Sequence, residues 1–151
     1  MMIKSNNILN SIHEVGIRIL IQLYLLNGKE KSSDYISSLD YLSLYSKTFN
    51  IGDNDLNGQN PYRLGEFASR LNVGKQSLKF LVSLGLCSVI HVNKGFRYVI
   101  TDSGIKVVEN LSNDYAELYK QIAKNTQSVF SDYSDVDIIK YISMISNKKE
   151  S

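Results

Sequence analysis

The sequence is poor in features that would place it outside the cell or in a membrane. It has one cysteine, Cys87, so an intrachain disulfide is impossible and a reducing compartment is expected. Its beginning, MMIKSNNILN, has neither a long apolar run nor a small-residue cleavage site, so we expect no signal peptide. The most apolar run, Val15–Leu26, contains Arg18 and is too short to cross a bilayer. We therefore predict a cytoplasmic protein without membrane contact.

Residues that carry catalysis or bind metals are also scarce. The only histidines are His13 and His91, and HEVGI, which starts at His13, has Ile17 where a zinc-protease motif needs its second histidine. Residues 53–58, DNDLNG, begin like a calcium loop, but Leu64 stands where that loop needs glutamate, so an Asx-rich surface loop is favoured. No GxxxxGKS/T, GxGxxG or GxSxG motif is present. The sequence predicts a protein that is not an enzyme, with no metal, cofactor or small-molecule substrate.

The chain does contain enough apolar residues to fold, together with a local excess of positive charge. Hydrophobic residues make up 43% and charged residues 21%, as in ordinary globular proteins. The net charge is only +2, but residues 61–111 hold seven Lys/Arg against three Asp/Glu. This excess keeps nucleic-acid binding among the functions to be considered.

Apolar periodicity predicts two N-terminal helices. Ile12–Leu26 is apolar almost all round, apart from a narrow stripe that holds Arg18 and Gln22, and such a helix is expected to be buried against several neighbours. A second helix is predicted over Asp34–Thr48, with a polar stripe that includes Asp40.

Residues 61–111 have the order of a winged helix-turn-helix. The first predicted helix covers Leu64–Leu71, with a Glu66–Arg70 pair on its outer side, and a turn follows at Asn72-Val73-Gly74. The second helix covers Lys75–Leu84 and is capped by Gly85. Two strands are then predicted at Cys87–Val92 and Phe96–Thr101, joined by NKG, and a further helix covers Ile105–Leu111. A helix pair followed by a β-hairpin is typical of the winged helix.

The remaining residues predict a helical tail. Tyr115, Leu118, Tyr119 and Ile122 repeat at helical spacing, and Ser134 begins a last helix with a capping-box-like pattern. We therefore predict a mainly α fold of the α+β class. A winged-helix domain over residues 1–111 includes the N-terminal helices, and a C-terminal helical extension covers residues 112–151.

The helix over Lys75–Leu84 is the main candidate for recognition. With its apolar side toward the core, it presents Gln76, Phe80 and Ser83 on the opposite side. Gln76 could bond a base edge, but a phenylalanine in the centre suits contact with another protein better. Gln76, Phe80 and Ser83 are therefore candidates for partner binding.

Nucleic-acid binding stays open as an alternative. Lys75, Lys79, Lys94 and Arg97 could contact phosphates, although scattered charges of this density are often an ordinary solvated surface. The alternative function is a homodimeric winged-helix transcription regulator that binds DNA, with the tail helices as its dimer interface.

Several short motifs occur in the order found in one known family. They are EVGIRILIQL (Glu14–Leu23), LDYLSLYS (Leu39–Ser46), NPYRLGE (Asn60–Glu66), LVSLGLCSVIHVNKGFRYVITDSG (Leu81–Gly104) and YAELYKQIAKN (Tyr115–Asn125). In these motifs the chain resembles the small middle component of the bacterial ABC-three component systems, which overlap with the Lamassu-type anti-phage systems.

The resemblance implies a non-catalytic accessory subunit of an anti-phage or anti-plasmid defence complex. Members are encoded beside an SMC- or Rad50-like coiled-coil ATPase and a separate effector, often a nuclease. The implied role is to bridge the ATPase and the effector, and to hold the effector inactive until invading DNA is sensed. DNA contact would come through the complex.

The resemblance also adds candidate residues for partner contact. The family's Arg-x-Gly-Glu element corresponds to Arg63, Gly65 and Glu66, and its Leu-Asp-Tyr-Leu element places Asp40 and Tyr41 among the candidates. From the residues alone, Arg63 and Glu66 could instead form an intrahelical ion pair worth about 0.3–0.5 kcal/mol. Asp40 could likewise be solvated rather than salt-bridged to a partner. The loop before Arg63 is longer and richer in asparagine than in the family.

Overall fold

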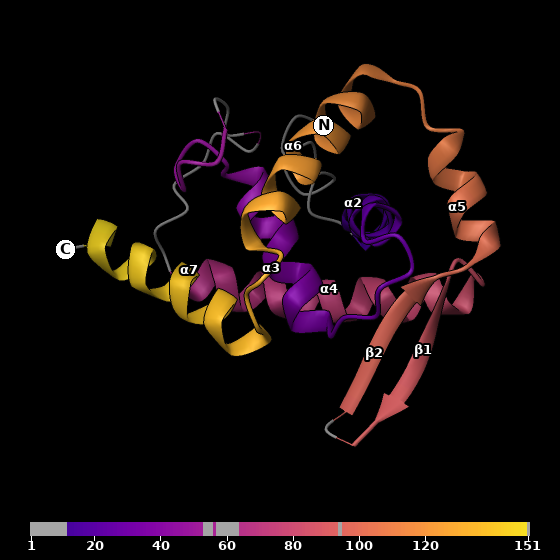
Figure 1. Ribbon diagram of the computed structural model, residues 1–151, viewed down its shortest axis with the longest axis horizontal. Coiled ribbons are helices and arrows are strands. Elements are labelled where there is room, and N and C mark those ends of the chain that lie inside the picture. The colour runs from indigo at the N-terminus through magenta and orange to yellow at the C-terminus, as the bar shows by residue number, and fades with distance from the viewer. Residues whose placement is uncertain (1–11, 53–55, 57–63, 94, 151) are drawn as a thin grey trace, which may run out of the picture.

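The computed structural model describes residues 12–52, 56, 64–93 and 95–150. Over these residues the chain forms helices and one two-stranded antiparallel sheet (Figure 1). The elements are α2 (Ile12–Leu25), α3 (Ser33–Leu44), α4 (Leu64–Ser83), β1 (Cys87–Val92), β2 (Gly95–Ile100), α5 (Asp102–Glu109), α6 (Asp114–Phe130) and α7 (Asp135–Glu150). The prediction of a mainly helical fold with a small β-hairpin is confirmed.

Helix α2 is the centre of the fold. It contacts α3, α4, α5 and α6, and Figure 1 shows it end-on with α5 and α6 arching over it. Its buried side chains include both the apolar residues and the polar Arg18 and Gln22. The predicted burial of this helix against several neighbours is confirmed, and Asn27 and Gly28 end it with positive φ angles of 54° and 88°.

Helix α3 has no solvent-facing side in its central part. Ser32 caps its start by accepting a hydrogen bond from the Tyr35 amide, and all residues from Tyr35 to Ser46 are buried. The tail helices α6 and α7 contact α3, and α6 reaches Asp40 through the Tyr119 hydroxyl. The polar stripe is therefore covered by neighbouring helices at Asp40.

Helix α4 corrects the sequence prediction. The turn predicted at Asn72-Val73-Gly74 is absent, because Leu64–Ser83 is one continuous helix. Gly74 serves close packing instead: a Cβ at this position would overlap the Ser37 hydroxyl of α3. The helix does end as predicted, at Gly85 (φ +75°), where the amides of Gly85 and Leu86 each donate over 3.0 Å to the carbonyls of Val82 and Leu81.

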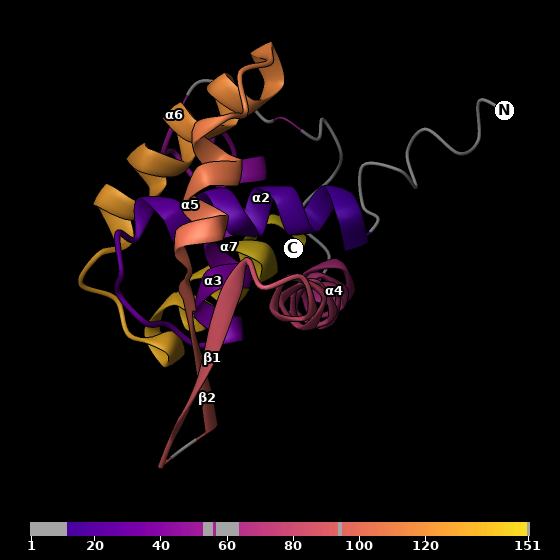
Figure 2. The same cartoon turned by 90° about the vertical axis from the view of Figure 1, so that its right-hand side faces the viewer.

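Strands β1 and β2 form the predicted antiparallel hairpin, which projects from the helical body (Figure 2). Its register pairs Cys87 with Ile100 and His91 with Phe96. Lys31, between α2 and α3, makes an isolated antiparallel bridge to Tyr98, with backbone hydrogen bonds of 2.8 and 3.2 Å. This bridge ties the base of the hairpin to the N-terminal helices.

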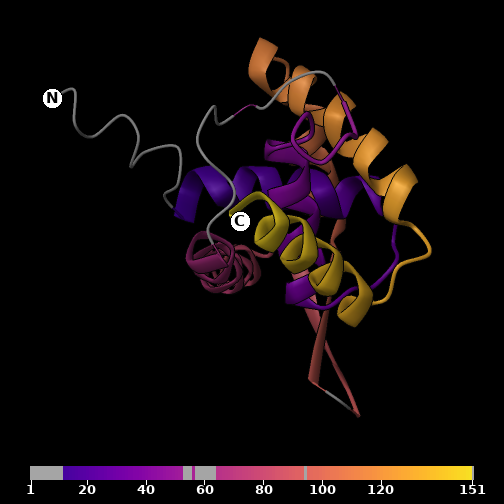
Figure 3. The ribbon, with the colours of Figure 1, turned by 90° about the vertical axis from the view of Figure 1, so that its left-hand side faces the viewer.

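The tail helices share the core of the preceding helices. Asn113 and Ser134 cap their starts by accepting hydrogen bonds from the amides of Ala116 (2.8 Å) and Asp137 (3.1 Å). Figure 3 shows α7 beside α3, which it contacts. The buried cluster around α2 and α3 also contains residues of both tail helices: Tyr119, Ala123, Phe130, Ile138 and Ile142. The predicted boundary at residue 111 falls in the connection between α5 and α6.

Within the described residues, no helix combines the length and the apolar character needed to span a bilayer.

Candidate functional site

A buried ion pair lies at the centre of the molecule. Arg18 of α2 donates through Nε to Asp40 Oδ1 of α3 over 2.9 Å and through Nη2 to Oδ2 over 3.3 Å. Tyr119 of α6 donates its hydroxyl to Asp40 Oδ1 over 2.6 Å. Arg18 and Asp40 are 2% and 4% exposed. Burial opposes the charge of Arg18, but the carboxylate of Asp40 outweighs burial and raises the pKa of the guanidinium.

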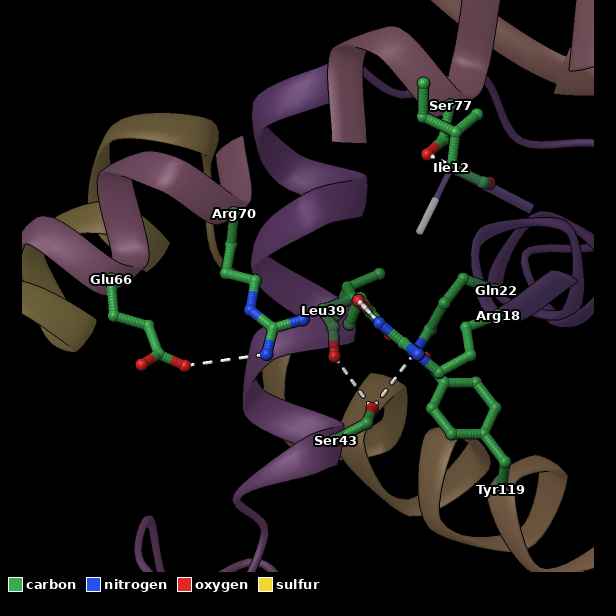
Figure 4. Close-up of polar contacts among 10 residues, drawn as sticks. Ile12, Arg18, Gln22, Leu39, Ser43, Glu66, Arg70, Ser77 and Tyr119 are labelled. Atoms are coloured by element: carbon green, nitrogen blue, oxygen red, sulfur yellow. Dashed lines mark hydrogen bonds and ion pairs between the residues drawn. The ribbon is translucent and has the colours of Figure 1, made fainter. Parts of the chain in front are cut away.

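Gln22 extends this ion pair into a hydrogen-bonded cluster (Figure 4). Its Nε2 donates to the hydroxyls of Ser43 (3.0 Å) and Tyr119 (2.9 Å). Gln127 of α6 donates to the Gln22 side-chain oxygen over 2.8 Å and to its carbonyl over 2.9 Å. Burial raises the pKa of Tyr119 well above its ordinary value, and the neighbouring Asp40 raises it further.

The buried cluster has a structural role. Its central residues are too enclosed for a substrate to reach, and their bonds join α2, α3 and α6 in one arrangement. Within the described part of the chain, no group of three or more His, Cys, Asp and Glu side chains is placed to hold a metal ion. The arrangement can therefore orient helices, and it offers no reacting groups to solvent.

Two of the residues suggested for partner contact belong to this interior. Asp40 is neither solvated nor free for a partner, because Arg18 neutralises it in the core. Tyr41 is fully buried, with its ring 5.1 Å from those of Tyr45 and Phe67. Sequence reasoning missed the ion pair, although the polar stripe in an otherwise apolar α2 was a signal that a buried counter-charge was needed.

The structure describes only part of the family's Arg-x-Gly-Glu element. Arg63 lies outside the described residues. Glu66 is part-buried, accepts the Tyr45 hydroxyl over 2.8 Å and pairs with Arg70 at 3.5 Å. The predicted Glu66–Arg70 pair is thus confirmed, and both interactions lie within the chain.

The Phe80 side chain is not fully exposed on the surface of α4. Its ring is half-buried and packs edge-on against His13 of α2, with ring centroids 5.0 Å apart. The prediction that this ring is the outward anchor is corrected on this point, because the start of α2 covers part of it. Gln76 and Ser83 are exposed as predicted, and so are Lys75 and Lys79.

An exposed aromatic ring occurs instead on the hairpin. Phe96 is 52% exposed and lines a groove of about 280 Å³ between α4 and the hairpin. The lining residues are Lys79, Val82, Val89, His91, Phe96 and Tyr98. We call this the α4–hairpin groove. Sequence reasoning did not identify Phe96 or Val89. Alternation along the strands was the available signal, because each of them lies two residues from a buried position, Tyr98 or Cys87, and therefore on the same face of the hairpin.

The groove lies in a segment without negative charge. No Asp or Glu occurs between Glu66 and Asp102. Lys75 and Lys79 are exposed on α4, whereas Arg97 is part-buried and alternates with Phe96 and Tyr98, so it belongs to the other face of the hairpin. Lys94 lies outside the described residues. The four lysines and arginines suggested for phosphate contact therefore do not form one described cluster.

Comparison with known protein families identifies the family of the chain. The family model described as MC2, ABC-three component (ABC-3C) system Middle Component 2, matches residues 8–150. No curated protein and no solved structure matches the chain.

Proposed function

The chain belongs to the Middle Component 2 family of ABC-three component systems, and from this premise we propose that it is a non-catalytic bridging subunit of a bacterial defence complex. It joins an SMC-like coiled-coil ATPase to an effector nuclease of an anti-phage or anti-plasmid system of the Lamassu type. It works in the cytoplasm, and contact with DNA comes through the assembled complex.

The observation that supports this proposal is the family match over nearly the whole chain. The distribution of polar groups agrees with it: the described ionisable cluster is locked in the core, while the exposed groove is apolar and flanked by lysines. A surface of this kind suits binding rather than chemistry.

We propose that the helices and hairpin form a winged helix. In this arrangement α3 and α4 are the helix pair, β1 and β2 are the wing, and α2 packs behind. The bridge between Lys31 and Tyr98 supports the proposal, because it adds a strand-like segment between the first two helices to the base of the wing.

The alternative is a homodimeric DNA-binding regulator. Its expected dimer interface is the tail helices, part of whose apolar residues, such as Tyr119 and Ile138, pack into the chain's own core. The family match favours the bridging subunit.

Co-expression of the untagged ATPase and effector with the tagged chain tests the proposal. Stable co-purification of all three components supports it. Failure of the wild-type chain to retain either component, together with tight, sequence-selective and salt-sensitive DNA binding by the chain alone, would transfer support to the regulator.

A further inference from the structure

The α4–hairpin groove continues a face that is buried at the base of the hairpin. Cys87 and Tyr98 are 2% and 6% exposed, and the next positions along the same face, Val89 and Phe96, are 37% and 52% exposed. Val89 pairs with Tyr98 and His91 with Phe96, so these side chains stand side by side. The apolar face thus runs beyond the part that the helical body covers.

Val82 of α4 forms the opposite wall. Together with Val89, Phe96 and Tyr98 it makes the lining mainly apolar. The hairpin projects from the body (Figures 1 and 2), and the groove lies between the hairpin and α4. Its volume of about 280 Å³ suits a few apolar side chains of another polypeptide.

The lysines of α4 indicate the partner's chemistry. Lys79 lines the groove, Lys75 lies one turn earlier on the same helix, and neither the hairpin nor α4 beyond Glu66 contains an acidic residue. A segment with Asp or Glu beside its apolar residues would meet complementary charge here, whereas a basic segment would be repelled.

A polypeptide fits these observations better than a nucleic acid. Phosphate binding needs several cations that follow a backbone, and the groove itself is lined by one lysine and one histidine among mainly apolar residues. An exposed phenylalanine among valines offers the packing surface that anchor side chains of protein partners use.

We propose that the α4–hairpin groove binds an acidic polypeptide segment with apolar anchors, carried by another component of the same defence complex. This inference rests on the function proposed above. Phe96 provides the central apolar contact, and Lys79 provides the charge that favours an acidic partner.

The test uses the full chain co-expressed with the ATPase and the effector. Phe96→Asp is the apolar-contact variant, and Val136→Asp is its control, since Val136 is 61% exposed on α7. Lys79→Glu is the charge variant, and Lys140→Glu, also exposed on α7, is its control. Thermal unfolding of each isolated variant establishes that it is folded.

We expect Phe96→Asp to weaken association with one component by about ten-fold or more, and Lys79→Glu to weaken it by a few-fold, more at low salt than at high salt. Both controls should stay within about two-fold of wild type. Folded variants of Phe96 and Lys79 that retain wild-type association would overturn the groove proposal while leaving the bridging function in place.

A crosslinking experiment identifies the occupant. With p-benzoylphenylalanine at position 96, the complex should yield a crosslinked partner peptide that contains Asp or Glu beside apolar residues. A basic peptide, a second copy of this chain, or a crosslink to single-stranded nucleic acid in place of a component would overturn the proposal. Absence of any complex with the wild-type chain would instead refute the bridging function itself.

Discussion

Arg18 and Asp40 form a two-bond ion pair in the core, with Nε 2.9 Å from Oδ1 and Nη2 3.3 Å from Oδ2. The pair joins the two helices around which the rest of the chain is built, and Tyr119 adds a third helix through its bond to Asp40. A buried pair of this kind specifies how helices align, because any other register would leave a charge without its partner.

Removal of Asp40 should destabilise the fold strongly. Asp40→Ala removes the buried carboxylate that accepts two hydrogen bonds from the Arg18 guanidinium, so we expect the free energy of unfolding to fall by about 3–5 kcal/mol in urea titrations. The control is Glu117→Ala, which breaks a more exposed pair with Lys120 (3.4 Å) and should change stability by less than about 1 kcal/mol. Equal effects of the two substitutions would contradict a central role for the buried pair.

Tyr119 should make the protein sensitive to alkaline pH. Burial and Asp40 raise its pKa in the folded state, so its contribution to stability is present below the unfolded pKa of about 10 and is lost as pH rises toward the folded value. Tyr119→Phe should lower stability at neutral pH, because it removes the hydrogen bond to Asp40, but should flatten the loss above pH ~10. Equal slopes for the variant and the wild type in that range would show that Tyr119 does not contribute.

Cys87 should resist thiol reagents in the native protein. Burial raises the pKa of its thiol to about 12, so little thiolate exists near neutral pH. Its contribution to stability should be lost as pH rises from about 9 toward about 12. Labelling with a disulfide reagent should be slow and should accelerate with urea as the protein unfolds. Ser103→Cys in a Cys87→Ala background, which places the thiol at an exposed position, should react at once.

Any side chain larger than that of glycine at position 74 should destabilise the fold unless the Ser37 side chain of α3 moves or is removed. Gly74→Ala puts a Cβ against the Ser37 hydroxyl, so we expect a loss of about 1–3 kcal/mol in unfolding free energy. Ser37→Gly should restore much of that loss in the double variant, since it removes the overlapping atoms. A double variant no more stable than Gly74→Ala would place the strain elsewhere.

Local sequence signals identified most elements but not their surroundings. The periodicity of α2, the glycine after α4 and the spacing of the hairpin all correspond to observed structure. The segment Asn72-Val73-Gly74 has the composition of a turn, yet it is helical, and its glycine lies where α4 packs closely against Ser37 of α3. Local propensity contains no information about that contact.

The candidate site depended even more on distant contacts. The polar stripe of its helix predicts Asp40 at the surface, and only its contacts with Arg18 and Tyr119 show that it is buried. The exposure of Phe96 depends on where the hairpin leaves the helical body, which alternation along the strands cannot reveal. The acid-free segment around the groove, by contrast, is visible in the sequence itself.

Phe80 and Phe96 should behave in opposite ways when each is replaced by alanine. Phe80 packs against His13, so Phe80→Ala should lower unfolding free energy by about 1–2 kcal/mol, while association measured on the folded protein stays within about two-fold of wild type. Phe96 is 52% exposed, so Phe96→Ala should change stability by less than about 0.5 kcal/mol and yet weaken the complex. Urea titrations and binding measurements on the same two variants separate a packing role from a contact role. If Phe80→Ala weakened the complex and Phe96→Ala did not, Phe80 on α4 would be the partner contact, and Phe96 would be an exposed side chain without a role in binding.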